Sequence, residues 1–247
     1  MRVTEIVRLA TQPIEKLLIP QETSPLMLQG SLYHAHILRH ETKGVPDSVD
    51  IIQADSYRTK QAQEARDSSL ASDRLPCLAK DWEAISSTPK STMQALHSIF
   101  KADKFELELQ GKVKHFGEIV GHLDSLNGIF VSDLKISQQN DRLDKKIFDY
   151  GYQLQMFLYM ELAQVEQAKL VFFNPQANAI FTKELCYYDL LAECEALLDK
   201  AYRNYCQLNN IAEKGVYVES SSYNPPQWVL SELLEAESNQ PKETNEI

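Results

Sequence analysis

Several features that would assign a protein to a large functional class are missing from this sequence of 247 residues. No apolar run approaches the ~20 residues that a membrane-spanning helix requires. Glycine is scarce, with 8 residues, and no glycine-rich phosphate loop of the Walker type is present. These absences argue against a membrane-spanning protein and against an enzyme that hydrolyses nucleoside triphosphates through a Walker-type loop.

Cysteine is also scarce, and its spacing is uninformative for metal binding. The closely spaced C-x₂-C pairs that hold iron–sulfur clusters are absent, and the intervals between the four cysteines are long and irregular: Cys77, Cys186, Cys194 and Cys206. We therefore expect reduced, partly buried thiols, with neither a cluster nor a disulfide. The first 18 residues contain no continuous apolar core of a signal peptide, so we expect a cytoplasmic protein.

Net positive charge, the usual mark of a nucleic-acid-binding protein, is lacking as well. The formal net charge is −10, whereas DNA affinity depends on Lys and Arg that neutralise phosphates. Part of the excess negative charge lies in residues 231–247, which contain five glutamates and one lysine. Basic residues remain elsewhere: Arg58, Lys60, Arg66, Lys101, Lys104, Lys112 and Lys114. They either line a DNA-binding surface or are scattered solubilising charges, and the sequence leaves both interpretations open.

The clearest positive signal is a predicted β-hairpin. The segments 119–124 and 129–136 are apolar and β-branched, and Asn127-Gly128 between them is a strong turn signal. Folding back at this turn places Asp124 near the second segment.

Two carboxylates and a lysine meet on that hairpin. Asp133 and Lys135 lie on the same face of a strand because side chains alternate, and Asp124 approaches them from the first strand. Carboxylate oxygens suit Mg²⁺, and an ammonium can orient a water or steady negative charge on a phosphate. The alternative interpretation is an ordinary salt bridge on a solvated strand.

The surrounding elements form a known order. We predict a helix over 91–100, a strand over 104–110, the hairpin, a helix over 145–163 and a strand over 168–173. This α-β-β-β-α-β order resembles the core of the PD-(D/E)XK nuclease superfamily. In that pattern Asp124 matches the first acid and Asp133-x-Lys135 the (D/E)xK element. The resemblance implies an α/β fold, with a central mixed sheet flanked by helices and an N-terminal helical extension.

The next segment is similar to the Tyr-x-x-Gln motif of RecB-type and RecE-type nucleases. Gln155 matches the family's glutamine, and Tyr152 and Tyr159 match its tyrosines. Spacings of three and four place all three on one helix face. The glutamine would bind the lysine or a phosphate, and the tyrosines would contact substrate. As an alternative, the tyrosines belong to the apolar core.

The resemblance also implies further metal ligands. Gly30-Ser31-Leu32-Tyr33-His34 resembles the helix that brings the family's histidine to the metal, so His34 is a candidate ligand. The third acid is expected at Glu106, with Glu108 as the reserve. The backbone carbonyl of Leu134 would complete the set in the family pattern.

Together with a further match over 57–85, the likeness extends across about residues 26–185 and is greatest to the RecE-like (exodeoxyribonuclease eight) phage exonucleases. It implies Mg²⁺-dependent 5′-to-3′ degradation of one strand of linear duplex DNA, with Mn²⁺ as a substitute ion. The product would be a 3′ overhang for a single-strand annealing protein. The enzyme would be a ring-shaped homo-oligomer in the cytoplasm of a bacterial host. A DNA- or partner-binding module with little catalysis, or a related endonuclease, remains the alternative.

The expected domain organisation is simple, since this length suits one compact domain. We expect a single domain over 1–230, in which 26–90 is helical, 91–175 is the nuclease core and 176–230 is a strand and a helix. Residues 231–247 are acidic and polar, so we expect a disordered tail.

Overall fold

The computed structural model describes residues 1–19, 24–38, 45–101, 104–138 and 142–214, with side chains up to residue 210. The predictions for 215–230 and for the tail therefore lie outside the described residues. The chain divides into two units after Asn209, and the description below concerns the unit Met1–Asn209.

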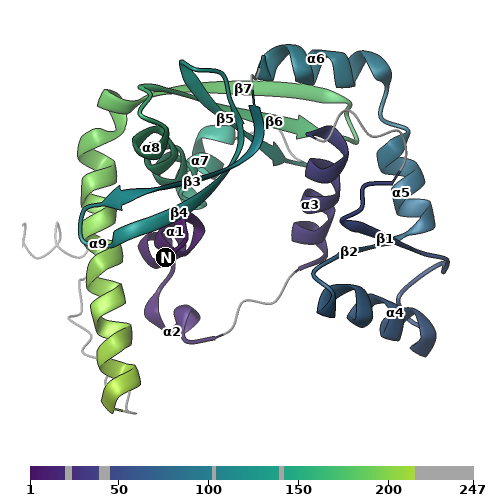
Figure 1. Ribbon diagram of the computed structural model, residues 1–247, viewed down its shortest axis with the longest axis horizontal. Coiled ribbons are helices and arrows are strands. Elements are labelled where there is room, and N and C mark those ends of the chain that lie inside the picture. Colours follow the sequence, from purple (N-terminus) through teal and green to yellow (C-terminus); the bar gives the residue numbers. More distant parts are fainter. Residues whose placement is uncertain (20–23, 39–44, 102–103, 139–141, 215–247) are drawn as a thin grey trace, which may run out of the picture. The chain divides into compact units, whose positions relative to one another are not determined.

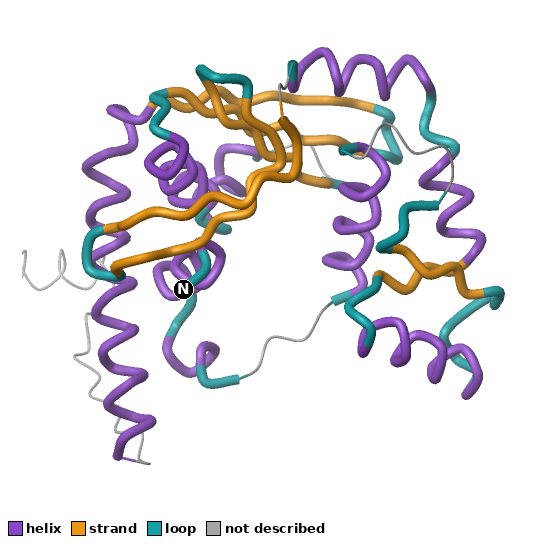
Figure 2. The backbone as a smooth tube through the Cα atoms, in the orientation of Figure 1, coloured by secondary structure: helices purple, strands orange, loops and turns teal. Residues whose placement is uncertain are grey.

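A five-stranded mixed sheet forms the centre of this unit (Figures 1 and 2). Its strands stand side by side in sequence order: β3 (Lys104–Val113), β4 (Gly117–Leu126), β5 (Phe130–Ile136), β6 (Gln167–Asn174) and β7 (Ala179–Cys186). Strands β5 and β6 are parallel, and the other neighbours are antiparallel. This confirms the predicted α/β fold with a mixed sheet.

The hairpin between β4 and β5 forms where the turn signal predicts it. Gly128 has a φ of +71°, which a glycine adopts without steric cost. The Asn127 amide donates to the Phe130 carbonyl and closes the turn.

Helices cover both faces of the sheet, as the two separate apolar clusters show. On one face α1 (Val3–Thr11), α8 (Tyr152–Ala163) and α9 (Tyr187–Lys214) pack with the sheet around residues such as Val131 and Leu154. On the other face α3 (Pro25–Ile37), α5 (Ala79–Ser86) and α6 (Lys90–Phe100) pack around residues such as Leu134 and Val171. Strands β5 and β6 are therefore buried between two layers of helices.

The single helix predicted over 145–163 is wrong, because the chain breaks into α7 (Leu143–Asp149) and α8. Gly151 lies at the break with a φ of +67°. A Cβ at this position would stand 2.7 Å from Thr11 Cγ2 and 2.9 Å from Val7 Cγ1. The break is therefore held in close contact with α1.

The N-terminal part contains two strands that the sequence pattern does not indicate. Besides α2 (Ile14–Leu17), α3, α4 (Lys60–Ala71) and α5, it includes β1 (Val49–Ile52) and β2 (Leu75–Leu78). These two strands pair in parallel as a separate sheet, and α4 is the crossover between them. Four residues are too few to show a strand period, so the sequence alone does not reveal them.

The helices in the described part of the chain do not combine the length and the apolar character that a bilayer requires. None of them could span one.

Candidate active site

The predicted acids converge where β4 and β5 separate. These two fully described strands pair only at Ser125↔Ser132 and Leu126↔Val131. Beyond that point the Leu134 amide donates to Asp124 Oδ2 at 2.6 Å instead of to a strand carbonyl. The early end of the ladder therefore gives the Asp124 carboxylate a fixed backbone partner. We call this place, with Asp124, Asp133 and Lys135, the fork.

A buried polar chain lies on the α8 side of the fork. Lys135 Nζ stands 2.7 Å from Asp133 Oδ2 and donates to Gln155 Oε1 at 3.0 Å. Gln155 Nε2 donates to Tyr159 OH at 3.0 Å and lies 3.4 Å from Asp133 Oδ1. Asp133 and Gln155 are almost fully buried. A buried carboxamide needs partners on both of its ends, and here one end binds the lysine and the other the acid and the tyrosine.

Two further predicted residues reach the fork from the helices. His34 of α3 places Nδ1 3.4 Å from Asp124 Oδ1. Tyr152, at the start of α8, has its ring centroid 4.4 Å from Lys135 Nζ, which is a cation–π contact. The structure thus brings together Asp124, Asp133, Lys135, Gln155, His34, Tyr152 and Tyr159, together with the backbone of Leu134.

The pKa values of the two acids are shifted in opposite directions. Burial raises the pKa of Asp133, the charge of Asp124 raises it further, and Lys135 only partly offsets them, so this pKa lies above its ordinary value. Burial also acts on Asp124, but the charge and hydrogen bond of His34 and the Leu134 amide outweigh it, and the pKa of Asp124 is lowered. Separated pKa values in one pair of carboxyl groups are typical of sites that do acid–base or metal chemistry.

The two basic groups keep their protons more firmly than usual. Burial alone would lower the pKa of Lys135, but the Asp133 carboxylate raises it above its ordinary value. The pKa of His34 is raised in the same way, because Asp124 outweighs the effect of burial. Both basic groups are therefore electrostatically coupled to the acids of the fork.

The third acid is less well placed. Glu106 is exposed on β3 with a φ of +47°, and its neighbours pair at Phe105↔Ser125 and Leu107↔Leu123, which puts it opposite Asp124 in register. Glu108, also exposed, has Oε2 3.8 Å from His122 Nε2. Across the described part of the chain, no three His, Cys, Asp or Glu side chains are grouped to hold a metal ion. The assignment of Glu106 stays a prediction.

Two neighbours of the site were not predicted from the sequence. The ring of Tyr150 stacks on Tyr152 with centroids 5.6 Å apart, and Lys146 donates to Ser137 Oγ at 2.9 Å. The signal for Tyr150 was the Tyr-Gly-Tyr triplet at 150–152, in which a glycine interrupts a helical pattern.

Comparison with known proteins agrees with this geometry. The family model of the PD-(D/E)XK nuclease superfamily matches residues 3–237. The chain belongs to this superfamily. No curated protein matches the sequence at a significant level.

Three solved structures are similar to this chain at low identity. A candidate exonuclease of Eubacterium rectale is 12% identical, covers 94% of this chain and 91% of its own, and has a TM-score of 0.52. A phage-related exonuclease of Haemophilus somnus 129PT is 14% identical, with coverages of 85% and 95% and a TM-score of 0.41. An alkaline exonuclease of Laribacter hongkongensis is 13% identical, with coverages of 65% and 88% and a TM-score of 0.35. Of these three, the first supports a shared fold, and the lower scores of the other two carry no argument.

The donor set of this superfamily member fits a hard divalent cation by its chemistry. Asp124 and Asp133 offer carboxylate oxygens, the ligands that Mg²⁺ and Mn²⁺ prefer, and His34 lies beside them. The raised pKa of Asp133 shows that its negative charge is penalised by burial and by the neighbouring acid. A bound cation would relieve that penalty.

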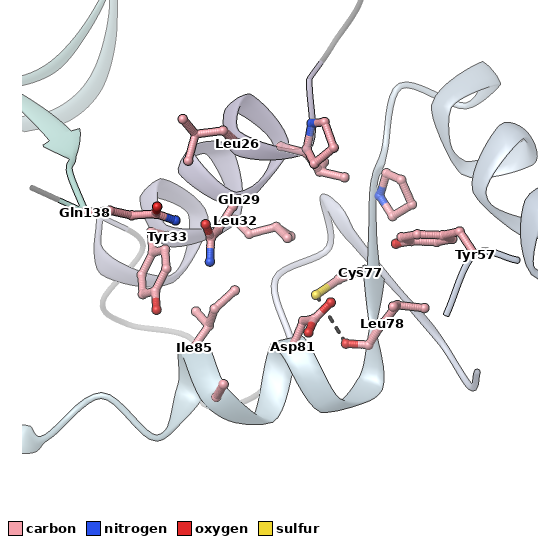
Figure 3. A pocket seen from close by; sticks show the side chains of 14 residues that line it. Leu26, Gln29, Leu32, Tyr33, Tyr57, Cys77, Leu78, Asp81, Ile85 and Gln138 are labelled. Atoms are coloured by element: carbon pink, nitrogen blue, oxygen red, sulfur yellow. Dashed lines mark hydrogen bonds between the residues drawn. The ribbon is translucent and has the colours of Figure 1, made fainter. Parts of the chain in front are cut away.

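A cavity of about 560 Å³ lies apart from these acids, between α3, β2 and α5 (Figure 3). Its wall combines apolar side chains with polar ones, among them Gln29, Asp81 and Gln138. Tyr33 lines it, whereas the next residue of α3, His34, contacts Asp124. The cavity and the fork are therefore served by different sides of one helix.

Proposed function

We propose that this protein is a metal-dependent deoxyribonuclease that degrades linear duplex DNA from its 5′ ends and leaves 3′ single-stranded overhangs. The observation that carries the proposal is the buried chain Asp133–Lys135–Gln155 beside Asp124. A binding module has no need of a buried ammonium held by two fixed acceptors, whereas phosphodiester hydrolysis needs a cation at a set position.

Each residue has a separate role in the proposed reaction. Asp124 and Asp133, with His34, Glu106 and the Leu134 carbonyl, would hold Mg²⁺, or Mn²⁺ in its place. When bound, the ion would supply a water of lowered pKa and would neutralise charge on the phosphate. Lys135 orients the attacking water, because its ammonium is fixed between Asp133 and Gln155. Asp133 and Gln155, which hold this ammonium, are almost fully buried, and this limits competition from bulk water.

The finer parts of the proposal rest on the family resemblance. Strand polarity, a ring-shaped homo-oligomer that encircles DNA, a single-strand annealing partner and a bacterial cytoplasmic setting belong to the RecE-like pattern. The tyrosines Tyr152 and Tyr159 would contact substrate or fix the site from within. Tyr159 is buried against Gln155, which favours the second role for it.

The test is digestion of end-labelled linear duplex DNA with Mg²⁺, beside a covalently closed circle and an EDTA control. Loss of the linear substrate alone, only with metal, is the expected result, and the label reports the polarity. Asp124→Asn should abolish cleavage, whereas the surface control Asp144→Asn, which removes an exposed partner of Lys183, should not.

Other outcomes would redirect the assignment. Cleavage of the circle would make the protein an endonuclease. DNA binding without cleavage of either substrate, over a range of divalent metals, would make it a binding module.

A further inference from the structure

The short helix α7 presents an aromatic ring beside the fork. Tyr150, at the C-terminal end of α7, is 59% exposed, and its ring stacks on Tyr152 at an interplanar angle of 28°. The Tyr152 ring in turn lies against Lys135 Nζ. Tyr150 is therefore one ring away from the ammonium that acts on the phosphate.

This stack is held in place by the chain around it. Gly151, between the two tyrosines, has no room for a side chain because Thr11 and Val7 of α1 pack against it. Tyr152 also contacts Phe172 of β6, with ring centroids 6.4 Å apart. The ring of Tyr150 consequently rests on a fixed support, so that little ordering entropy is lost when a ligand binds to it.

A second cationic side chain lies one turn earlier on α7. The Tyr150 amide donates to the Lys146 carbonyl, and Lys146 Nζ donates to Ser137 Oγ at 2.9 Å. Ser137 follows β5, and its amide donates to the Phe173 carbonyl, so it continues the pairing with β6. It stands two residues beyond Lys135 on the same side of the strand, roughly 7 Å away. Lys146 thus places a second ammonium near the end of β5.

An ammonium and an exposed aromatic ring, both rigidly placed, are the two components that proteins use to bind a single strand of nucleic acid. We propose that α7 forms a nucleotide subsite next to the scissile phosphate, in which Tyr150 stacks on a base and Lys146, with Ser137, binds a backbone phosphate. This inference rests on the proposed function and specifies which substrate groups are recognised. Stacking tolerates every base, so the subsite would position the strand without sequence preference.

The experiment measures binding of a fluorescent single-stranded oligonucleotide by anisotropy in EDTA, where no cleavage takes place. A strand of the same length with abasic sites throughout serves as the second probe. Tyr150→Ala should weaken binding of the normal strand about 5- to 100-fold, the range for loss of one stacked base, and leave the abasic strand unaffected. Tyr150→Phe should restore binding. The matched control is Tyr188→Ala, since Tyr188 is 63% exposed and bonds Glu166.

Lys146→Gln should weaken both strands alike and lower the salt dependence of binding by about one phosphate contact, and Lys146→Arg should restore it. Three results would overturn the subsite: wild-type protein that binds neither strand, equal loss of both strands in Tyr150→Ala, or an unchanged salt slope in Lys146→Gln. The linear-DNA digestion separates this from the proposed function. Cleavage with Tyr150-independent binding overturns the subsite alone, and Tyr150-dependent binding without cleavage overturns the function alone.

Discussion

Strand β5 has two very different borders. Along β6 it pairs at seven successive positions, from Phe130↔Gln167 to Ile136↔Phe173. Along β4 it pairs at only two, next to the turn. The first border, which we call the seam, is continuous along the whole of β5, whereas the fork leaves the Leu134 amide to a carboxylate.

The difference shows how the fold produces a site without leaving the Leu134 amide unpaired. A buried amide must find an acceptor, and at the fork a side chain from the diverging strand supplies it. The charged groups gather where the ladder ends, and the apolar residues of β6, such as Leu170 and Val171, fill the two cores where it continues. Rigid pairing on one border holds the chemistry of the other border in position.

The sharpest test of this comparison substitutes one lysine at each border, in two separate variants. Lys135 contacts a carboxylate at 2.7 Å and an aromatic ring, and Lys169 of β6 contacts Glu184 at 3.3 Å and the Phe130 ring. Lys135→Met should lower the cleavage rate by about 10²- to 10³-fold, because the fixed ammonium proposed to orient the attacking water is lost. Lys169→Met should cleave as wild type does. Steady-state cleavage measures both, and circular dichroism checks the fold. Normal turnover in Lys135→Met would refute the role of the fork.

A smaller effect is expected from the glutamine that orients the lysine. Gln155→Ala should lower the rate by about 10- to 100-fold with little change in KM, since the residue acts through Lys135 and Asp133. The control Gln153→Ala removes a glutamine of similar burial that donates to Glu193 instead. Equal losses of cleavage rate in the two variants would show that Gln155 contributes only to packing.

The histidine at the edge of the fork should affect metal use more than turnover. His34→Ala removes the side chain that contacts Asp124, so we expect the Mg²⁺ concentration for half-maximal cleavage to rise about tenfold. His36→Ala, on the same helix but against Trp82, should leave the titration unchanged. Identical titrations for wild type and His34→Ala would exclude His34 as a ligand.

The two apolar clusters that the seam strands fill can be probed with thiol reagents. This experiment tests packing and not cleavage, and its expected effect is the smallest of the four. Burial raises the pKa of Cys77 to about 11 and that of Cys194 to about 12. At pH 8 both groups are therefore almost entirely protonated thiols, which react slowly, and their reaction should accelerate as the pH rises. Cys186 and Cys206 are only half-buried and should be labelled first in a time course followed by mass spectrometry. Early labelling of Cys194 would show that the core opens.

Much of the fold and of the fork could be predicted because local patterns determine them. The Asn127-Gly128 turn fixes the hairpin, and strict alternation puts Asp133 and Lys135 on one face. A spacing of four also places Gln155 and Tyr159 together, as their hydrogen bond shows.

Other features depend on contacts distant in sequence and could not be predicted. Gly151 separates two helices where α1 packs against it, and although a glycine can interrupt a helical pattern, the packing of Thr11 and Val7 against it cannot be read from the local sequence. The left-handed backbone of Glu106 depends on the strand beside it. The pairing of β1 with β2 joins two four-residue segments that are too short to show a period.

The seam has a consequence for folding errors. In a strand, a shift of one residue in pairing turns every side chain to the opposite face. If β5 slipped by one position against β6, Leu134 would face Gln155, and Asp133 and Lys135 would enter the apolar cluster around Phe173. Such a state would bury two charges away from their partners, so it would be far less stable than the native sheet. The correct register of β5 against β6 and the arrangement of the fork side chains therefore depend on each other.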